Sequence, residues 1–183
     1  MFDVAIIGDG PGGLSAALFL AKNGLSTVVY GQDKTAMHWA YLRNYLGIDE
    51  ISGTDFQVVA KKQVERFGAR LESRLVDAVS REGDQFRVTF EGGESVTSRY
   101  VILSEGKAPK LAQQLGVRFE GPAAVTDQNG QTSVPGVYAV GRLARPARSQ
   151  AIISAGDGAA AAIDILSRDK GEDVTDWDSP PET

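Results

Sequence analysis

The sequence predicts an α/β fold: a parallel sheet with helices, to which a β-meander is added. Within the first thirty residues, an apolar run, a glycine turn, a helical repeat of apolar residues and a second apolar run follow one another. This succession is typical of a strand–helix–strand unit, so the expected arrangement is Rossmann-like. Between residues 69 and 104, alternating apolar and polar residues with a Gly92-Gly93 turn predict consecutive antiparallel strands.

The spacing of apolar residues places each element along the chain. Runs with helical spacing predict helices at 14–24, 54–68 and 154–166. Buried or alternating runs predict strands at 3–7, 27–30, 86–90, 100–103 and 137–140. Thr54 is expected to cap the second helix, because threonine accepts a hydrogen bond from a first-turn N–H. Residues 31–53 and 107–133 lack a clean period and are expected to be mostly loop.

The length of 183 residues fits a single domain. We expect that domain to span residues 1–168 and to be followed by an acidic, flexible tail over 169–183. No apolar run approaches the roughly 18 residues that would cross a bilayer. The N-terminus begins directly with a strand pattern and has no basic region, so no signal peptide and a cytoplasmic location are expected.

The composition excludes several kinds of chemistry. The chain contains no cysteine, which excludes a thiolate nucleophile, disulfide exchange and thiolate metal sites. His38 is the single histidine and cannot form a multi-histidine site, so no metal site is expected. A net charge of −5 argues against a nucleic-acid partner, which requires a basic surface. The chemistry is therefore expected to come from a bound cofactor.

The glycines Gly8, Gly10 and Gly13 follow the first strand and begin the first helix, in the pattern G-x-G-x-x-G. In a dinucleotide fingerprint the first glycine forms the tight turn and the second lets a pyrophosphate approach the backbone. The third lets the helix pack on the strand. The alternative is a purely structural glycine turn, but the complete strand–helix–strand context favours dinucleotide binding.

The acidic residue that would hold the adenosine ribose should close the second strand, about twenty residues further on. Tyr30, Gly31 and Gln32 stand there, and Asp33 comes slightly late. Either Asp33 reaches back to the ribose, or the backbone around Gly31 contacts it. A solvated loop acid is the other interpretation of Asp33.

Further motifs are spread over the chain: Asn44–Gly47 with Ser52-Gly53, Gln63–Gly68, Tyr100–Gly106, Thr132–Gly141 and Gln150–Ala162. Together with the fingerprint they make residues 1–165 resemble the FAD-binding domain of the low-molecular-weight thioredoxin reductase family, among the two-dinucleotide-binding flavoproteins. The resemblance implies a Rossmann-like FAD-binding domain.

The chain departs from that family in two respects. Only about 26 residues separate Gly106 from Thr132, where the family inserts an NADPH domain with a second fingerprint and a redox Cys-x-x-Cys. Arg142 stands where the family has an acid that accepts hydrogen bonds from the ribityl chain, and Ser149 replaces a frequent arginine. An arginine at 142 would either pair with a phosphate or leave that contact unmade.

The residues expected to hold FAD are Gly8, Gly10, Pro11, Gly12, Gly13, Tyr30, Gly31, Asp33, Asn44, Val76, Val79, Gly106, Gly141, Arg142, Gln150 and Ala151. By resemblance, Asn44 would lie near the isoalloxazine, although capping a loop is its alternative role. The backbone of Val79 would meet the adenine. Gln150 would begin a helix whose N-terminus stabilises negative charge on reduced flavin. His38 is the candidate for proton transfer, or else an exposed loop histidine.

Two classes of function follow. The first is a flavoprotein oxidoreductase that uses bound FAD, receives electrons from a separate donor protein or a diffusible reductant, and is not a dithiol–disulfide reductase. The alternative is a non-catalytic FAD- or nucleotide-binding module, or a subunit of a larger complex. An NAD-binding Rossmann domain is a third hypothesis, which leaves the C-terminal flavin motif without a purpose. A homodimer would shield an exposed flavin face.

Overall fold

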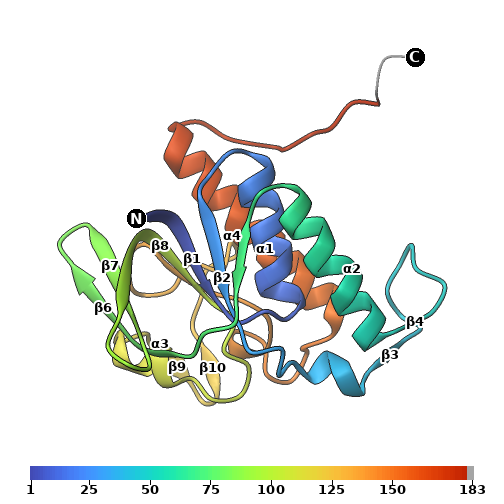
Figure 1. Ribbon diagram of the computed structural model, residues 1–183, viewed down its shortest axis with the longest axis horizontal. Helices are drawn as coiled ribbons and strands as arrows, with labels where there is room; N and C mark the ends of the chain where they lie inside the picture. The colour runs from blue at the N-terminus through green and yellow to red at the C-terminus, as the bar shows by residue number, and fades with distance from the viewer. Residues whose placement is uncertain (181–183) are drawn as a thin grey trace.

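The computed structural model describes residues 1–180 and arranges them in layers (Figure 1). Helices cover one face of the parallel strands, and the meander covers the other. In chain order the elements are β1 (Phe2–Ile7), α1 (Pro11–Lys22), β2 (Thr27–Tyr30), η1 (Ala36–Trp39), β3 (Tyr41–Leu42), β4 (Ile51–Ser52), α2 (Gly53–Arg66), β5 (Arg70–Glu72), β6 (Val76–Glu82), β7 (Gln85–Phe90), β8 (Ser95–Leu103), α3 (Lys110–Gln114), β9 (Phe119–Glu120), β10 (Ala123–Ala124), β11 (Val137–Ala139), η2 (Gly141–Leu143) and α4 (Ala151–Lys170).

The main sheet has the order β5-β2-β1-β8-β7-β6, with β11 paired to β8. Strand β1 runs parallel to β2 and β8, and β7 runs antiparallel to β8 and β6. The nine-residue β8 joins the two parts, because Ser95–Ser98 pair with β7 whereas Val101–Leu103 pair with β11. The predicted fold class, a mainly parallel sheet with an added meander, is confirmed.

Two hydrophobic cores lie on the two faces of the parallel strands. In β1, Val4 and Ile6 face the core shared with α1, α2 and α4, whereas Ala5 and Ile7 face the core shared with the meander. All four are less than 9% exposed. This burial on both faces explains why the strand is a continuous apolar run in the sequence.

Some elements differ from the prediction at their ends. Helix α1 begins at Pro11, three residues before the predicted start, because proline is favoured in the first helical turn. Helix α2 begins at Gly53, and the prediction of Thr54 as its N-cap is wrong. Ser52 is the cap: its Oγ accepts a hydrogen bond from Asp55 N at 3.1 Å. Helix α4 is longer than predicted and continues to Lys170, past the expected domain end at 168.

Helices α1 and α4 pack closely at glycine. A Cβ atom on Gly158 of α4 would lie 2.0 Å from the carbonyl oxygen of Gly12 in α1. Only glycine permits this approach of two backbones. The contact places the N-terminal part of α4 against the glycine fingerprint.

The residues after α4 lie along the end of α1, where the chain crosses the top of Figure 1. The N–H of Val174 donates to Ser167 Oγ at 3.0 Å. The carboxylate of Asp176 accepts hydrogen bonds from Lys22 Nζ at 3.0 Å and from Asn23 Nδ2 at 2.9 Å. Part of the predicted flexible tail, residues 181–183, lies outside the described residues.

Replacing Asp176 by glycine is expected to release residues 174–180 while changing the urea midpoint little. Asp176 has a φ of 49° and a side chain that is only 7% exposed, so glycine keeps the backbone conformation and removes the contacts. Hydrogen exchange at Val174 N–H should become faster. Asp178→Gly is the control, because Asp178 is 73% exposed and, among the residues that the structure describes, its carboxylate is paired with Lys22. Unchanged exchange in the Asp176 variant would contradict this prediction.

Candidate functional site

The glycines of the fingerprint take up three different environments. A Cβ on Gly8, whose φ is +112°, would lie 2.3 Å from Ser104 O, and one on Gly13 would lie 2.0 Å from Gly8 O. A Cβ on Gly10 would meet only Thr35 Oγ1, at 3.4 Å. The first glycine is therefore required by the turn and the third by packing, whereas the second faces open space that a ligand can occupy. This pattern is the one that a dinucleotide fingerprint requires.

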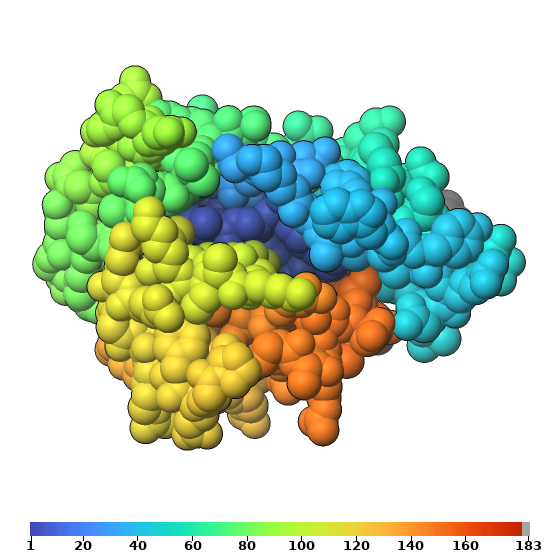
Figure 2. Space-filling view, turned by 90° about the horizontal axis from the view of Figure 1, so that it is seen from below, coloured from blue at the N-terminus to red at the C-terminus, as the bar shows by residue number. Residues whose placement is uncertain are grey.

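Figure 2 shows the molecule from the edge where the parallel strands end. N-terminal residues, dark blue in that view, form the floor of a hollow. Segments around residues 35 (blue), 107 (yellow-green) and 148 (orange) surround it. In open α/β sheets, ligands bind at this carboxyl edge of the strands. The half-buried residues 8–11 of the fingerprint thus lie at the bottom of the hollow.

Two helix N-termini meet at the fingerprint. Helix α1 begins after Gly10 and α4 begins after Gln150, and neither helix has a side-chain cap or an acidic residue in its first turn. A Cβ on Gly12 would lie 3.1 Å from the carbonyl oxygen of Ser154, which places the two first turns side by side. Free N–H groups and the helix dipoles favour a negatively charged group here. The site therefore fits the diphosphate and the electron-rich end of FAD.

A cluster of charged residues lies beside the fingerprint at the end of β2. Asp33 Oδ1 is 2.5 Å from Lys61 Nζ and 3.2 Å from His38 Nε2, and Lys61 also lies 3.4 Å from Asp9 Oδ2. Hydrogen bonds from Lys61, and then from His38, lower the pKa of Asp33. Burial by itself would lower the pKa of Lys61, but Asp33 and Asp9 together raise it. His38 Nδ1 is 3.0 Å from Thr54 Oγ1, so the histidine is held rather than free.

The predicted flavin-side residues come together from distant segments. Asn44 Nδ2 donates to Gln150 Oε1 at 3.2 Å, across 106 positions of the sequence. Arg142 Nε donates to Ser149 Oγ at 2.9 Å, so the two positions that depart from the family pattern contact each other. Gly141 has a φ of +63° and adjoins Ser154 at the start of α4. These contacts bring together three segments around the hollow: the loop after β11, the connection between β3 and β4, and the start of α4.

The side chains of Tyr30, Val76 and Val79 are buried in the meander-side core. The Tyr30 ring is buried, and its centroid lies 4.7 Å from that of the Phe90 ring. Burial raises the pKa of Tyr30 to about 12. Its carbonyl oxygen accepts from Gly8 N at 2.8 Å. The side chains of Val76 and Val79 belong to the meander-side core. Their roles, like those of Gly31, Gly106, Ala151 and Pro11, stay predictions.

Sequence reasoning missed Asp9, Gln57 and Lys61. Gln57 is 1% exposed and its Nε2 donates to Asp9 O at 2.8 Å. Asp9 stands inside the fingerprint, so an acid between two glycines was a signal available in the sequence. Gln57 and Lys61 carry no such signal, because only the packing of α2 against α1 brings them to the loop.

The fold and site define a dinucleotide-binding α/β domain of the flavoprotein type. The family model described as pyridine nucleotide-disulphide oxidoreductase matches residues 2–75 and 48–159. The chain belongs to this family, and the match indicates FAD as the cofactor, in agreement with the prediction from sequence.

Curated relatives and solved structures agree with this assignment. The chain is 35% identical over 117 residues to thioredoxin reductase of Helicobacter pylori, covering 60% of this chain and 37% of the relative. It is 28% identical over 119 residues to that of Mycoplasmopsis pulmonis, covering 63% and 39%. A thioredoxin reductase structure from Gloeobacter violaceus has the same fold, with a TM-score of 0.87, 19% identity and coverage of 97% and 99%. The matches therefore span less than two fifths of these curated relatives.

Proposed function

We propose that this chain holds FAD across the hollow and transfers electrons between a donor and an acceptor that are separate molecules. The observation that carries the proposal is the open face of Gly10 between two uncapped helix N-termini. These groups suit a diphosphate, and bound FAD would supply the redox chemistry.

The proposal of a separate electron donor is supported by what lies between Gly106 and Thr132. These residues form α3 and the β9–β10 pair, without a second glycine fingerprint. The 183 residues contain no cysteine, so this chain has no dithiol of its own to pass electrons to a disulfide. The donor is proposed to be a protein or a diffusible reductant that reaches the hollow directly.

Several of the predicted residues have a proposed role. The N–H groups of Gly12 and Gly13 would bind the diphosphate, and the N-terminus of α4 would stabilise negative charge on the reduced ring. Asn44, held by Gln150, would orient the ring edge. His38 is 27% exposed and contacts Asp33 and Thr54, which suits a positioning role at the rim better than a free proton donor.

A non-catalytic FAD-binding module or a subunit of a larger complex is the second candidate. The contact of Arg142 with Ser149 favours it, because that arginine replaces an acid and is directed toward the loop before α4. A homodimer and a cytoplasmic location remain parts of the proposal. In the part of the chain that the structure describes, no helix has the length and hydropathy needed to cross a bilayer.

The test is to purify the protein, add FAD, and record the visible spectrum after gel filtration. Retained flavin bands support the proposal, and their absence overturns it. Anaerobic titration then compares NADPH, NADH and a reduced ferredoxin. Reduction by a donor protein but not by the nucleotides, followed by reoxidation by an acceptor, is expected. Rapid stoichiometric reduction by NADPH would contradict the separate donor, and flavin that no donor reduces would favour the non-catalytic module.

Gly10→Ala is the variant that tests the diphosphate site in the same experiment, with the wild-type protein as its control. The added Cβ has 3.4 Å to its nearest neighbour, Thr35 Oγ1, so the protein should fold normally. The methyl group would occupy the face of the loop that we assign to the diphosphate, so retained flavin should fall sharply. If this variant retained as much flavin as the wild type, the assignment of Gly10 to the diphosphate site would be wrong.

A further inference from the structure

Gly31 stands where a dinucleotide fingerprint usually has an acid, and Asp9 puts an acid at a variable position of the fingerprint. The usual acid stands at the end of the second strand and hydrogen-bonds the ribose. Here β2 ends at Tyr30 and is followed by Gly31, whereas an acid stands between the first two glycines of the fingerprint.

The carboxyl group of Asp9 occupies the space next to Gly31. A Cβ on Gly31 would lie 2.3 Å from Asp9 Cγ and 2.6 Å from Asp9 Oδ2. A side chain at 31 would therefore collide with the Asp9 side chain in its observed conformation. The backbone N–H of Asp33 donates to Asp9 Oδ2 at 2.9 Å and fixes the carboxylate at the strand end.

A buried side chain of α2 supports the loop that carries Asp9. Gln57 is 1% exposed, and its Nε2 donates to the carbonyl of Asp9, but its Oε1 has no hydrogen-bond partner. A buried acceptor without a donor is unfavourable. Gln57 therefore holds the Asp9 loop through one hydrogen bond and keeps an orphaned acceptor on the same amide group.

The charges select the kind of ligand. A carboxylate inside a diphosphate-binding loop would repel the ligand unless it were compensated, and Lys61 Nζ lies 3.4 Å from Asp9 Oδ2. Asp33 contacts the same lysine at 2.5 Å, so two carboxylates share one ammonium group. Such a site accepts hydrogen bonds from a neutral diol and disfavours a phosphate at the same position.

We propose that Asp9, rather than an acid at the end of β2, binds the hydroxyl groups of an unphosphorylated adenosine ribose. This inference rests on the proposed binding of FAD. It assigns Asp33, one of the two alternatives that the sequence leaves open for this role, to holding Lys61 instead. Gly31 then provides the space for the Asp9 carboxylate and does not itself contact the ribose.

The test compares Asp9→Asn with Asp33→Asn by FAD titration, after both variants are shown to unfold cooperatively. Asn keeps the shape of each side chain and tolerates the positive φ of Asp33, which is 55°. Asp9→Asn should weaken FAD binding about tenfold or more, because a charged acceptor is lost. Asp33→Asn should stay within about threefold. A larger effect at Asp33, or none at Asp9, would overturn the assignment.

Two further measurements connect the effect to the ribose itself. Wild-type protein should bind ADP about tenfold more tightly than 2′-deoxy-ADP, and Asp9→Asn should lose most of this preference. In Asp9→Gly, adding Gly31→Asp should restore a large part of the FAD affinity by returning the acid to the strand end. Equal binding of the two nucleotides by the wild type, or no restoration in the double variant, would contradict the inference. A wild-type protein that binds no FAD would instead overturn the proposed function.

Discussion

Replacing Gly158 by alanine is expected to lower the free energy of unfolding by about 3 kcal/mol, because α1 and α4 would have to move apart. The added Cβ would lie 2.0 Å from Gly12 O, 2.9 Å from Gly12 C and 3.0 Å from Ala16 N. All three are backbone atoms, so no side-chain rotation can relieve the overlap. Since both helix N-termini border the hollow, retention of FAD should fall as well. Urea unfolding and flavin retention measure the two effects.

Gly156→Ala is the control for this prediction. Gly156 lies in the same helix, and a Cβ there would meet nothing within 4 Å. Alanine in a helix interior is more favourable than glycine, so this variant should be stabilised by about 0.5–1 kcal/mol. Destabilisation of both variants to the same extent would show that the close approach of α1 is not the cause.

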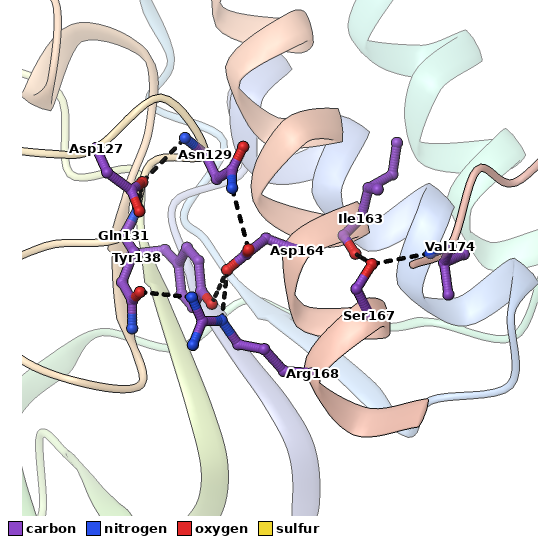
Figure 3. A network of polar contacts seen from close by, with 9 residues as sticks. All are labelled: Asp127, Asn129, Gln131, Tyr138, Ile163, Asp164, Ser167, Arg168 and Val174. Carbon is purple, nitrogen blue, oxygen red and sulfur yellow. Dashed lines mark hydrogen bonds and ion pairs between the residues drawn. The ribbon is translucent and has the colours of Figure 1, made fainter. Parts of the chain in front are cut away.

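Replacing Asp164 by alanine is expected to destabilise the fold by about 2–3 kcal/mol, because the buried hydroxyl of Tyr138 and two further donors would lose their acceptor. Figure 3 shows Asp164 of α4 between Tyr138 of β11, Asn129 and Arg168. Its carboxylate accepts from Tyr138 Oη and Arg168 Nε, each at 2.6 Å, and from Asn129 Nδ2 at 3.1 Å. Tyr138 is fully buried, and burial together with Asp164 raises the pKa of Tyr138, so the phenol stays protonated and donates.

Asp77→Ala is the matched control, because it also removes one carboxylate and one ion pair. Asp77 contacts Lys110 at 2.8 Å, but both side chains are about 60% exposed (62% and 59%). Exposed pairs contribute little, so the loss should stay below about 1 kcal/mol. A loss at Asp164 no larger than at Asp77 would mean that the network in Figure 3 does not stabilise the contact between α4 and β11.

The contribution of Asp164 should also depend on pH. Burial would raise the pKa of Asp164, but hydrogen bonds from Arg168, Tyr138 and Asn129 outweigh it and hold the pKa below its ordinary value of 3.8. The folded pKa lies below the unfolded pKa, so the stabilisation is fully present above pH 3.8 and is lost as pH falls through the folded value. The difference in unfolding free energy between wild type and Asp164→Ala should therefore be constant near neutrality and shrink in acid.

The sequence alone determined the fold class and the positions of its main elements. Apolar periodicity predicted β1, α1 and β2, and the glycine fingerprint located the site at the start of α1, because both signals are written within one short segment. The signal for the N-cap of α2 is also contained in a short segment, because Ser52 followed by Asp55 is a capping pattern. The residue predicted from the sequence was nevertheless Thr54.

Only the tertiary structure decided which side chains share the site. Asp9 lies against Gly31 across 22 positions, and Asn44 reaches Gln150 across 106. Periodicity reports how one segment is buried, whereas these contacts depend on how a loop, a strand end and a helix pack together. For the same reason, the sequence left the ribose acid open between Asp33 and the backbone of Gly31. In the structure, the carboxylate that lies next to Gly31 is that of Asp9, which belongs to the fingerprint itself.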